Sequence, residues 1–207
     1  MNLASSAAAS SALDEEIARA ELYGLLARLW YAPPDAQLLD AFKVAATEAP
    51  MQGAYLEEPW RQLVGAGRER TEAQLRAEYD TLFGGIGKPE VYLFGSHYLS
   101  GFLNDKPLAQ LRGELARLGL ARDDSVGETE DHVACLFEVM RYLIAGDDVA
   151  VANLTRQQAF YSAQIQPWIS NMCEAVAAHP AAGFYAALAR FTQAFAQVEA
   201  QAFDILD

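Results

Sequence analysis

Apolar residues recur at helical spacing along nearly the whole chain, and this pattern limits the fold more than any other feature. The first such segment places five residues on one helix face: Ala18, Leu22, Leu25, Leu26 and Leu29. No segment of useful length alternates apolar and polar residues as a half-buried strand does. Alanine and leucine dominate, and β-branched residues are few, which also favours helices. The sequence therefore predicts an all-α fold, a single bundle-like domain of about eight to ten helices.

Prolines, glycines and capping residues set the expected helix boundaries. A threonine followed three residues later by glutamine, Thr71 to Gln74, matches a capping box and opens one helix. Pro33-Pro34 ends the first helix, and Gly84-Gly85 ends the helix that Thr71 opens. The expected helices cover about 13–32, 35–47, 59–64, 71–83, 107–118, 129–145, 149–164, 167–178 and 181–203.

Residues 84–106 interrupt this succession of predicted helices. Five glycines and Pro89 surround an aromatic stretch from Val91 to Tyr98, and no clear helix is expected there. A run of this length without helix is unusual in a compact domain and is often functional. The alternative is a packed connection whose aromatic rings fill the core.

Charge and composition restrict the partners. The formal net charge is -13, and 12 acidic against 3 basic residues from Asp123 onward contribute -9 of it. Such a field repels nucleic acid and anionic membranes and attracts cationic partners, although it also serves simple solubility. No apolar run is long enough to span a bilayer. We therefore expect no nucleic-acid partner and no stable membrane insertion.

The termini and the cysteines point to a protein of a reducing compartment. Residues 1–12 are rich in alanine and serine, have no basic segment, and are expected to form a flexible tail before a domain at 13–207. The two cysteines, Cys135 and Cys173, fall among apolar residues of predicted helices and form neither a disulfide framework nor a zinc pattern. The expected location is the cytoplasm.

The segment from Asp123 to His132 places five carboxylates and one histidine within ten residues, around the start of a predicted helix. It reads Asp-Asp-Ser-Val-Gly-Glu-Thr-Glu-Asp-His. Three interpretations stay open from the residues alone: a helix cap, a catalytic or metal site, or an acidic surface for a basic peptide. There is no second histidine motif for a metal, and Ser96 in Phe-Gly-Ser-His-Tyr lacks the nucleophile-elbow pattern. We therefore predict neither a metal site nor a catalytic residue.

Three segments together resemble the TorD/DmsD family of cytoplasmic redox-enzyme maturation chaperones. They are Tyr79-Asp80-Thr81-Leu82-Phe83-Gly84-Gly85, Tyr92-Leu93-Phe94-Gly95-Ser96-His97-Tyr98, and Glu128-Thr129-Glu130-Asp131-His132. The third is similar to the family's Glu-Pro-x-Asp-His, with Thr129 in place of the proline. Their order, their spacing and the helical background make the set specific, and the resemblance covers about residues 15–205.

The resemblance implies a chaperone and not an enzyme. Such a chaperone binds the twin-arginine signal peptide and the apo-form of a molybdenum-cofactor oxidoreductase, assists cofactor insertion and delays export. It holds no stable cofactor of its own, since the client carries the molybdenum cofactor. It is a monomer or a domain-swapped dimer, with a hinge near 120–128. The expected client-binding residues are Glu128, Glu130, Asp131, His132, Tyr79, Leu82, Phe83, Tyr92, Phe94, Gly95, Ser96 and Tyr98.

Two other functions compete with this one. The first is a helical ligand-binding or regulatory module, in which the acidic segment is only a solvated helix cap. The second is a metal-dependent helical enzyme that uses His132 and nearby carboxylates. The chaperone function differs from both rivals in its expected ligand. A twin-arginine peptide has two guanidinium groups that pair bidentately with carboxylates, and an apolar stretch follows them.

Overall fold

Ten helices make up the described part of the chain. The computed structural model describes residues 3–47, 54–84 and 88–205. The helices are α1 (Leu3–Tyr31), α2 (Ala36–Val44), α3 (Ala54–Arg68), α4 (Glu72–Leu82), α5 (Gly95–Ser100), α6 (Lys106–Arg117), α7 (Val133–Ala145), α8 (Leu154–Gln164), α9 (Ile169–Ala177) and α10 (Phe184–Asp204). These residues contain no strand, only an isolated antiparallel bridge between Phe94 and His132. The all-α prediction is confirmed.

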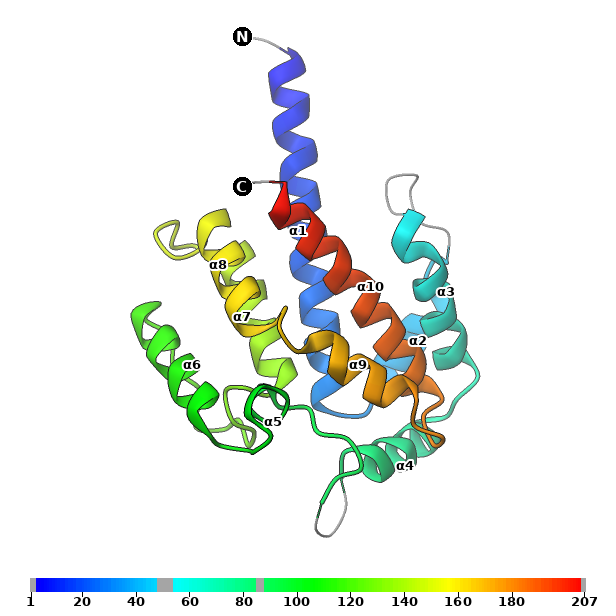
Figure 1. Ribbon diagram of the computed structural model, residues 1–207. Coiled ribbons are helices and arrows are strands. Elements are labelled where there is room, and N and C mark those ends of the chain that lie inside the picture. Colours follow the sequence, from blue (N-terminus) through cyan, green and yellow to red (C-terminus); the bar gives the residue numbers. More distant parts are fainter. Residues whose placement is uncertain (1–2, 48–53, 85–87, 206–207) are drawn as a thin grey trace.

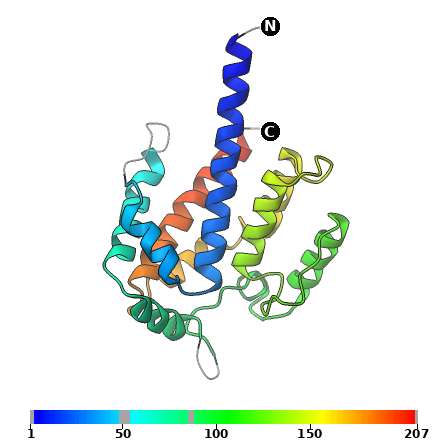
Figure 2. The same cartoon turned by 180° about the vertical axis from the view of Figure 1, so that it is seen from behind.

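Helices α1 and α10 cross at the centre, and the other helices pack around them. α1 lies behind α10 in Figure 1 and in front of it in Figure 2. α1 packs along α7, while α10 packs against α3, α4 and α9. Tyr23 of α1 meets Phe195 of α10 edge-on, and Trp30 donates a hydrogen bond to Thr192 at 3.0 Å. Aromatic side chains therefore build the core at this crossing.

The first helix begins earlier than the sequence indicates. α1 starts at Leu3, not near Leu13, and its first turns extend beyond the other helices (Figure 1). Alanine is the strongest helix former, so the segment before Leu13 can continue a helix that packing stabilises further along. The division into a tail at 1–12 and a domain at 13–207 stays a prediction.

Several local predictions agree with the structure. Thr71 accepts from the Gln74 amide at 3.3 Å, and the Gln74 side chain accepts from the Thr71 amide at 2.9 Å, so the capping box is confirmed. Asp35 caps α2 through the Leu38 amide. Gly119 follows α6 with a φ of 72°, a conformation that glycine adopts without strain. Local side-chain chemistry explains these boundaries.

Other boundaries were wrong. α3 extends on both sides of Pro59. Proline has no N–H to donate to the Tyr55 carbonyl four residues earlier, and Tyr55 is exposed near the start of the helix, where water can replace that hydrogen bond. A short helix, α5, occupies part of the interval 84–106 that was expected to lack helix. Helix α8 begins only after Asn153, whose side chain accepts from the Arg156 amide. Gly85, the second residue of the predicted Gly84-Gly85 stop, lies outside the described residues.

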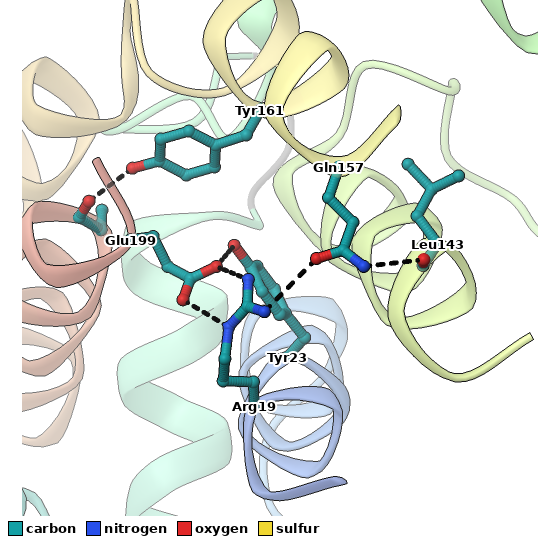
Figure 3. Close-up of polar contacts among 7 residues, drawn as sticks. Arg19, Tyr23, Leu143, Gln157, Tyr161 and Glu199 are labelled. Atoms are coloured by element: carbon teal, nitrogen blue, oxygen red, sulfur yellow. Dashed lines mark hydrogen bonds and ion pairs between the residues drawn. The ribbon is translucent and has the colours of Figure 1, made fainter. Parts of the chain in front are cut away.

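A buried polar network joins four helices near the middle of α1. The Arg19 guanidinium donates to both carboxylate oxygens of Glu199 on α10, at 2.8 and 2.7 Å, and Tyr23 donates to the same carboxylate at 2.9 Å. Gln157 of α8 accepts from Arg19 and donates to the Leu143 carbonyl of α7. Figure 3 shows these side chains converging from the four helices. The network fixes the mutual positions of helices that are distant in sequence.

Glu78 caps a helix more than a hundred residues away. This buried carboxylate on α4 accepts from the amides of Gly183, Phe184 and Tyr185 at 2.8, 3.3 and 2.8 Å. A negative charge at the start of α10 is favoured by the free amides and by the helix dipole. The contact joins α4 to the longest helix of the C-terminal half.

Candidate functional site

The acidic segment meets the aromatic stretch in a short backbone junction. The Val133 amide donates to the Leu93 carbonyl, and the Gly95 amide donates to the Asp131 carbonyl, both at 2.9 Å. This pairing removes residues 129–132 from the helix that was expected to start at 129, so α7 begins at Val133. Two of the three motif segments are therefore in direct contact, and they place the start of α5 beside the start of α7.

Asp131 caps α5 rather than its own helix. Its carboxylate accepts from the Ser96 amide at 2.9 Å and from the Thr129 hydroxyl at 2.7 Å, and the residue is only 3% exposed. Both carboxylate oxygens thus have a donor within the chain, as a buried charge requires. The structure places Asp131 as a positioning residue that holds the motif segments together. Its predicted contact with a client stays a prediction.

His132 is the N-cap of α7. Its Nδ1 accepts from the Ala134 amide at 3.2 Å, and its ring meets Phe94 and Tyr31 edge-on. The residue is 3% exposed. Burial lowers the pKa of His132 to about 4, and the Asp131 carboxylate opposes that shift without overcoming it. A neutral imidazole fits the capping role, because the capping nitrogen must accept a hydrogen bond.

The aromatic stretch is packed rather than open. Tyr92 stacks on His97, and Tyr98 stacks on Trp168 with ring centroids 5.6 Å apart. The Tyr98 hydroxyl donates to the Tyr92 carbonyl at 2.9 Å. A methyl group at Gly95 would lie 3.0 Å from the Trp168 indole nitrogen, so the close approach explains the glycine. Phe94, Tyr92 and Tyr98 keep partly exposed rings.

The first motif segment belongs to the core between α1, α4 and α10. Leu82 is fully buried, and Phe83 packs edge-on against Trp30 and Tyr185. The Tyr79 hydroxyl donates to the Tyr31 carbonyl at 2.7 Å, at the end of α1. Burial, with the nearby Glu128 carboxylate, raises the pKa of Tyr79. These residues anchor α4 against α1, and their predicted role in client binding stays a prediction.

A groove of about 590 Å³ opens beside the acidic segment, and we call it the α1/α7 groove. Its walls are the end of α1, the Pro33-Pro34 turn with the start of α2, the α6–α7 connection, and α7. It is lined by Ala27, Arg28, Tyr31, Ala32, Pro33, Pro34, Asp35, Leu38, Leu115, Leu120, Ala121, Arg122, Asp123, Val126, Glu130, Ala134, Cys135, Glu138, Val139 and Tyr142. Its size is that of an ordinary ligand-binding cleft.

The α1/α7 groove combines apolar walls with an acidic balance. Four of its lining residues are carboxylates and two are arginines. Glu130 is the predicted site residue that lines it. Its carboxylate accepts from Arg112 at 3.0 and 2.9 Å, and the Arg122 guanidinium lies 3.8 Å away. Burial alone would raise the pKa of Glu130, but the hydrogen bond and charge of Arg112 outweigh it and lower that pKa.

Cys135 and Tyr31 connect the groove to the rest of the predicted site. Cys135 lines the groove, and its pKa is raised to about 11, first by burial and then by the Glu128 and Glu130 carboxylates. The thiol is therefore protonated and weakly nucleophilic at neutral pH. Tyr31 lines the groove, meets the His132 ring, and accepts a hydrogen bond from the Gly127 amide at 3.3 Å. Glu128 lies close enough to influence Cys135 electrostatically, whereas Asp131 and His132 are buried and are not among the residues that line the groove.

Metal-binding clusters and membrane-spanning helices concern the rival functions. Within the described ranges, no group of three or more His, Cys, Asp or Glu side chains is placed to hold a metal ion. Across the same residues, no helix combines the length and apolarity needed to cross a membrane.

Sequence reasoning missed two parts of this arrangement. The first part is the pair of buried carboxylates Glu78 and Glu199, which lie on the apolar faces of α4 and α10. A single carboxylate at a core position of a helix could have indicated that each has a buried partner. The α1/α7 groove had no such signal, because its walls come from four separate segments. The motifs pointed to Glu130, which lines the groove, but not to its hydrophobic lining residues.

Comparison with known proteins places the chain among chaperone relatives. A sequence profile described as "Nitrate reductase delta subunit" matches residues 50–174. A "Chaperone protein TorD" of Aliivibrio fischeri is 28% identical over 141 residues, which is 64% of this chain and 66% of the relative. Its counterpart in Vibrio cholerae is 26% identical over 204 residues, 91% of this chain and 93% of the relative. The Photobacterium profundum protein of the same name is 28% identical over 153 residues, 69% and 71% of the two chains.

Proposed function

Since the chain belongs to the TorD family, we propose that it is a maturation chaperone for a molybdenum-cofactor oxidoreductase. In this role it binds the twin-arginine signal peptide and the apo-form of the client, assists cofactor insertion, and holds the client in the cytoplasm until it is mature. The chaperone itself carries out no covalent chemistry.

The observation that carries the peptide-binding proposal is the α1/α7 groove. A twin-arginine leader has two guanidinium groups followed by an apolar stretch. The groove lining has more carboxylates than arginines, with Glu130, Asp123 and Glu138 among them, and many apolar side chains. Guanidinium groups bind carboxylates bidentately, and an apolar segment gains free energy by leaving water in such a cleft. Both halves of the ligand thus have a complementary surface within one site.

We assign different roles to the residues that the motifs suggested. Glu130 and its neighbour Glu128 accept the guanidinium groups, and the groove wall takes the apolar stretch. Asp131 and His132 hold α5 and α7 in position, since the Asp131 carboxylate and His132 Nδ1 already accept hydrogen bonds and both residues are buried. The partly exposed rings of the aromatic stretch extend the surface toward the client body.

Peptide titration tests the proposal. The wild-type protein is titrated with a twin-arginine leader peptide and with a twin-lysine control, and tighter binding of the arginine peptide is expected. Glu130→Gln is expected to lower the affinity for the twin-arginine peptide roughly tenfold, because one charge-assisted hydrogen bond is lost. Glu174→Gln on α9 removes the same charge from an exposed position outside the groove, and it is expected to leave affinity unchanged.

Two outcomes would contradict the proposal. Equal affinity for the two peptides would show that guanidinium recognition does not occur. An effect of Glu174→Gln as large as that of Glu130→Gln would show that only the overall charge matters, and that the groove is not the site.

A further inference from the structure

Two arginines of the chain itself already occupy the carboxylate at the edge of the groove. Arg112 reaches Glu130 from α6 with two nitrogens, Nε at 3.0 Å and Nη2 at 2.9 Å, both to Oε2. Arg122 lies on the other side, with its Nε 3.8 Å from Oε1. Glu130 therefore has a cation on each oxygen, which is the arrangement that a pair of ligand arginines would form.

The two arginines are held differently. Arg122 also donates to the Val126 carbonyl, so it supports the α6–α7 connection that forms a groove wall. For Arg112, the hydrogen bonds and ion pairs found within the described residues all go to Glu130. Its side chain is 53% exposed, and α6 lies at the edge of the molecule beside α5 (Figure 1). Arg112 can leave Glu130 for water without disturbing another contact.

We propose that Arg112 is an internal competitor for the site of the proposed signal peptide, so that it sets the affinity threshold for cationic ligands. The inference rests on the proposed function. A guanidinium that approaches Glu130 meets a carboxylate whose charge is already compensated. It must displace the Arg112 side chain, which then points into the solvent. Peptides with a single cation or without an apolar stretch gain too little binding free energy to displace Arg112. Binding is therefore limited to ligands that use both the carboxylate and the apolar lining of the groove.

The charge pattern of α6 supplies a matched control. Arg117 lies on the same helix, is exposed, and pairs with Glu114 three residues earlier on that helix. It is not among the residues that line the groove. Arg112→Ala and Arg117→Ala therefore change the net charge equally and at neighbouring places. Only the first uncovers Glu130.

The experiment is a titration of wild type, Arg112→Ala and Arg117→Ala with the twin-arginine and twin-lysine leaders. We expect Arg112→Ala to bind both peptides about two- to fivefold more tightly, as the loss of a half-exposed ion pair allows. Arg117→Ala is expected to match wild type. In the background of Glu130→Gln, Arg112→Ala is expected to bring no gain, because the carboxylate for which it competes is gone. Thermal unfolding confirms that each variant is folded.

The failure of this inference differs from the failure of the proposed function. If wild type prefers the twin-arginine leader but Arg112→Ala does not exceed Arg117→Ala, the proposed function stands and Arg112 is no competitor. The same holds if the gain survives in Glu130→Gln. If neither wild type nor Arg112→Ala binds either leader, both proposals fail together.

Discussion

Two arginine–carboxylate pairs in this molecule have similar donor–acceptor distances and very different surroundings. Arg19 and Glu199 form a bidentate pair in which the carboxylate is 2% exposed and the guanidinium 23%. Arg112 and Glu130 form a pair of similar length at the groove, where the side chains are 53% and 14% exposed. In the first pair, Glu199 also accepts a hydrogen bond from Tyr23, and Arg19 also donates to Gln157. In the second pair, Glu130 also lies near Arg122 of the α6–α7 connection.

The difference shows what burial does to the same chemistry. A buried pair cannot exchange partners, because an unpaired charge would remain in the interior. A pair at a groove edge exchanges partners at low cost, since water can solvate the arginine that leaves. The chain therefore uses one pair to fix its helices and, in our proposal, the other to receive a ligand. This contrast leads us to expect effects of different sizes at the buried pair and at the groove.

The largest effect is expected at the buried pair. Glu199→Ala leaves the Arg19 guanidinium and the Tyr23 hydroxyl without their carboxylate, and we expect a loss of about 3–4 kcal/mol in the free energy of unfolding. Urea unfolding followed by circular dichroism measures it. Glu130→Ala is the control, with an expected loss below about 1 kcal/mol. Equal losses in the two variants would remove the distinction between the pairs.

The next effect concerns pH. Burial holds the pKa of His132 at about 4, below its ordinary value of 6.5, so the unfolded chain binds a proton more readily than the folded one. The contribution of neutral His132 is therefore complete above about pH 6.5 and is lost as the pH falls toward 4. We expect about 3 kcal/mol over this window.

His132→Asn isolates this contribution. Asparagine also caps helices, so the N-terminus of α7 keeps an acceptor while the titrating group disappears. The difference in unfolding free energy between wild type and variant is measured at several pH values between 7 and 4. A difference that stays constant with pH would show that His132 titrates normally and is not held neutral.

A smaller effect is expected at Asp131. Asp131→Ala leaves the buried Ser96 amide without its acceptor, and we expect a loss of about 2 kcal/mol in unfolding free energy. Asp131→Asn keeps an acceptor and is expected to lose less. If peptide affinity falls in Asp131→Ala while stability does not, Asp131 contacts the ligand directly and is no positioning residue.

The smallest effect is expected from salt on the leader peptide. Ions shorten the electrostatic range from about 10 Å at 0.1 M to about 3 Å at 1 M, so the affinity for the twin-arginine leader is expected to fall modestly. The apolar contacts of the groove persist at high salt. An affinity that does not change with salt would mean that the apolar stretch alone drives binding, and that Glu130 contributes nothing.

The sequence predicted what depends on local chemistry. Helix periodicity and the Thr71 capping box follow from neighbouring residues, and the structure confirms them. The start of α7 was wrong because residues 93–95 pair with 131–133, a contact that no local pattern reveals. The same long-range pairing turned Asp131 from a cap of its own helix into a cap of α5.

The candidate site also has a part that local sequence patterns predict and a part that depends on long-range packing. Motif order predicted Glu130, which lines the groove, together with the buried residues Asp131 and His132, which do not. Exposure depends on which segments cover a residue, and Tyr31, Leu38 and Leu120 come to the groove from three different parts of the chain. A motif therefore names the neighbourhood of the site, and tertiary packing decides which of its residues a ligand can reach.

We propose that the leader peptide occupies the α1/α7 groove, and the reactivity of Cys135 measures that occupancy directly. Cys135 is partly exposed and lines the groove, whereas Cys173 is buried elsewhere and serves as an internal control. The rate at which a small neutral alkylating reagent modifies each thiol is followed by mass spectrometry, with and without a saturating concentration of twin-arginine leader. We predict that the leader slows modification of Cys135 severalfold and leaves Cys173 unreactive throughout. An unchanged rate at Cys135, under conditions where titration shows the leader bound, would place the peptide outside the groove.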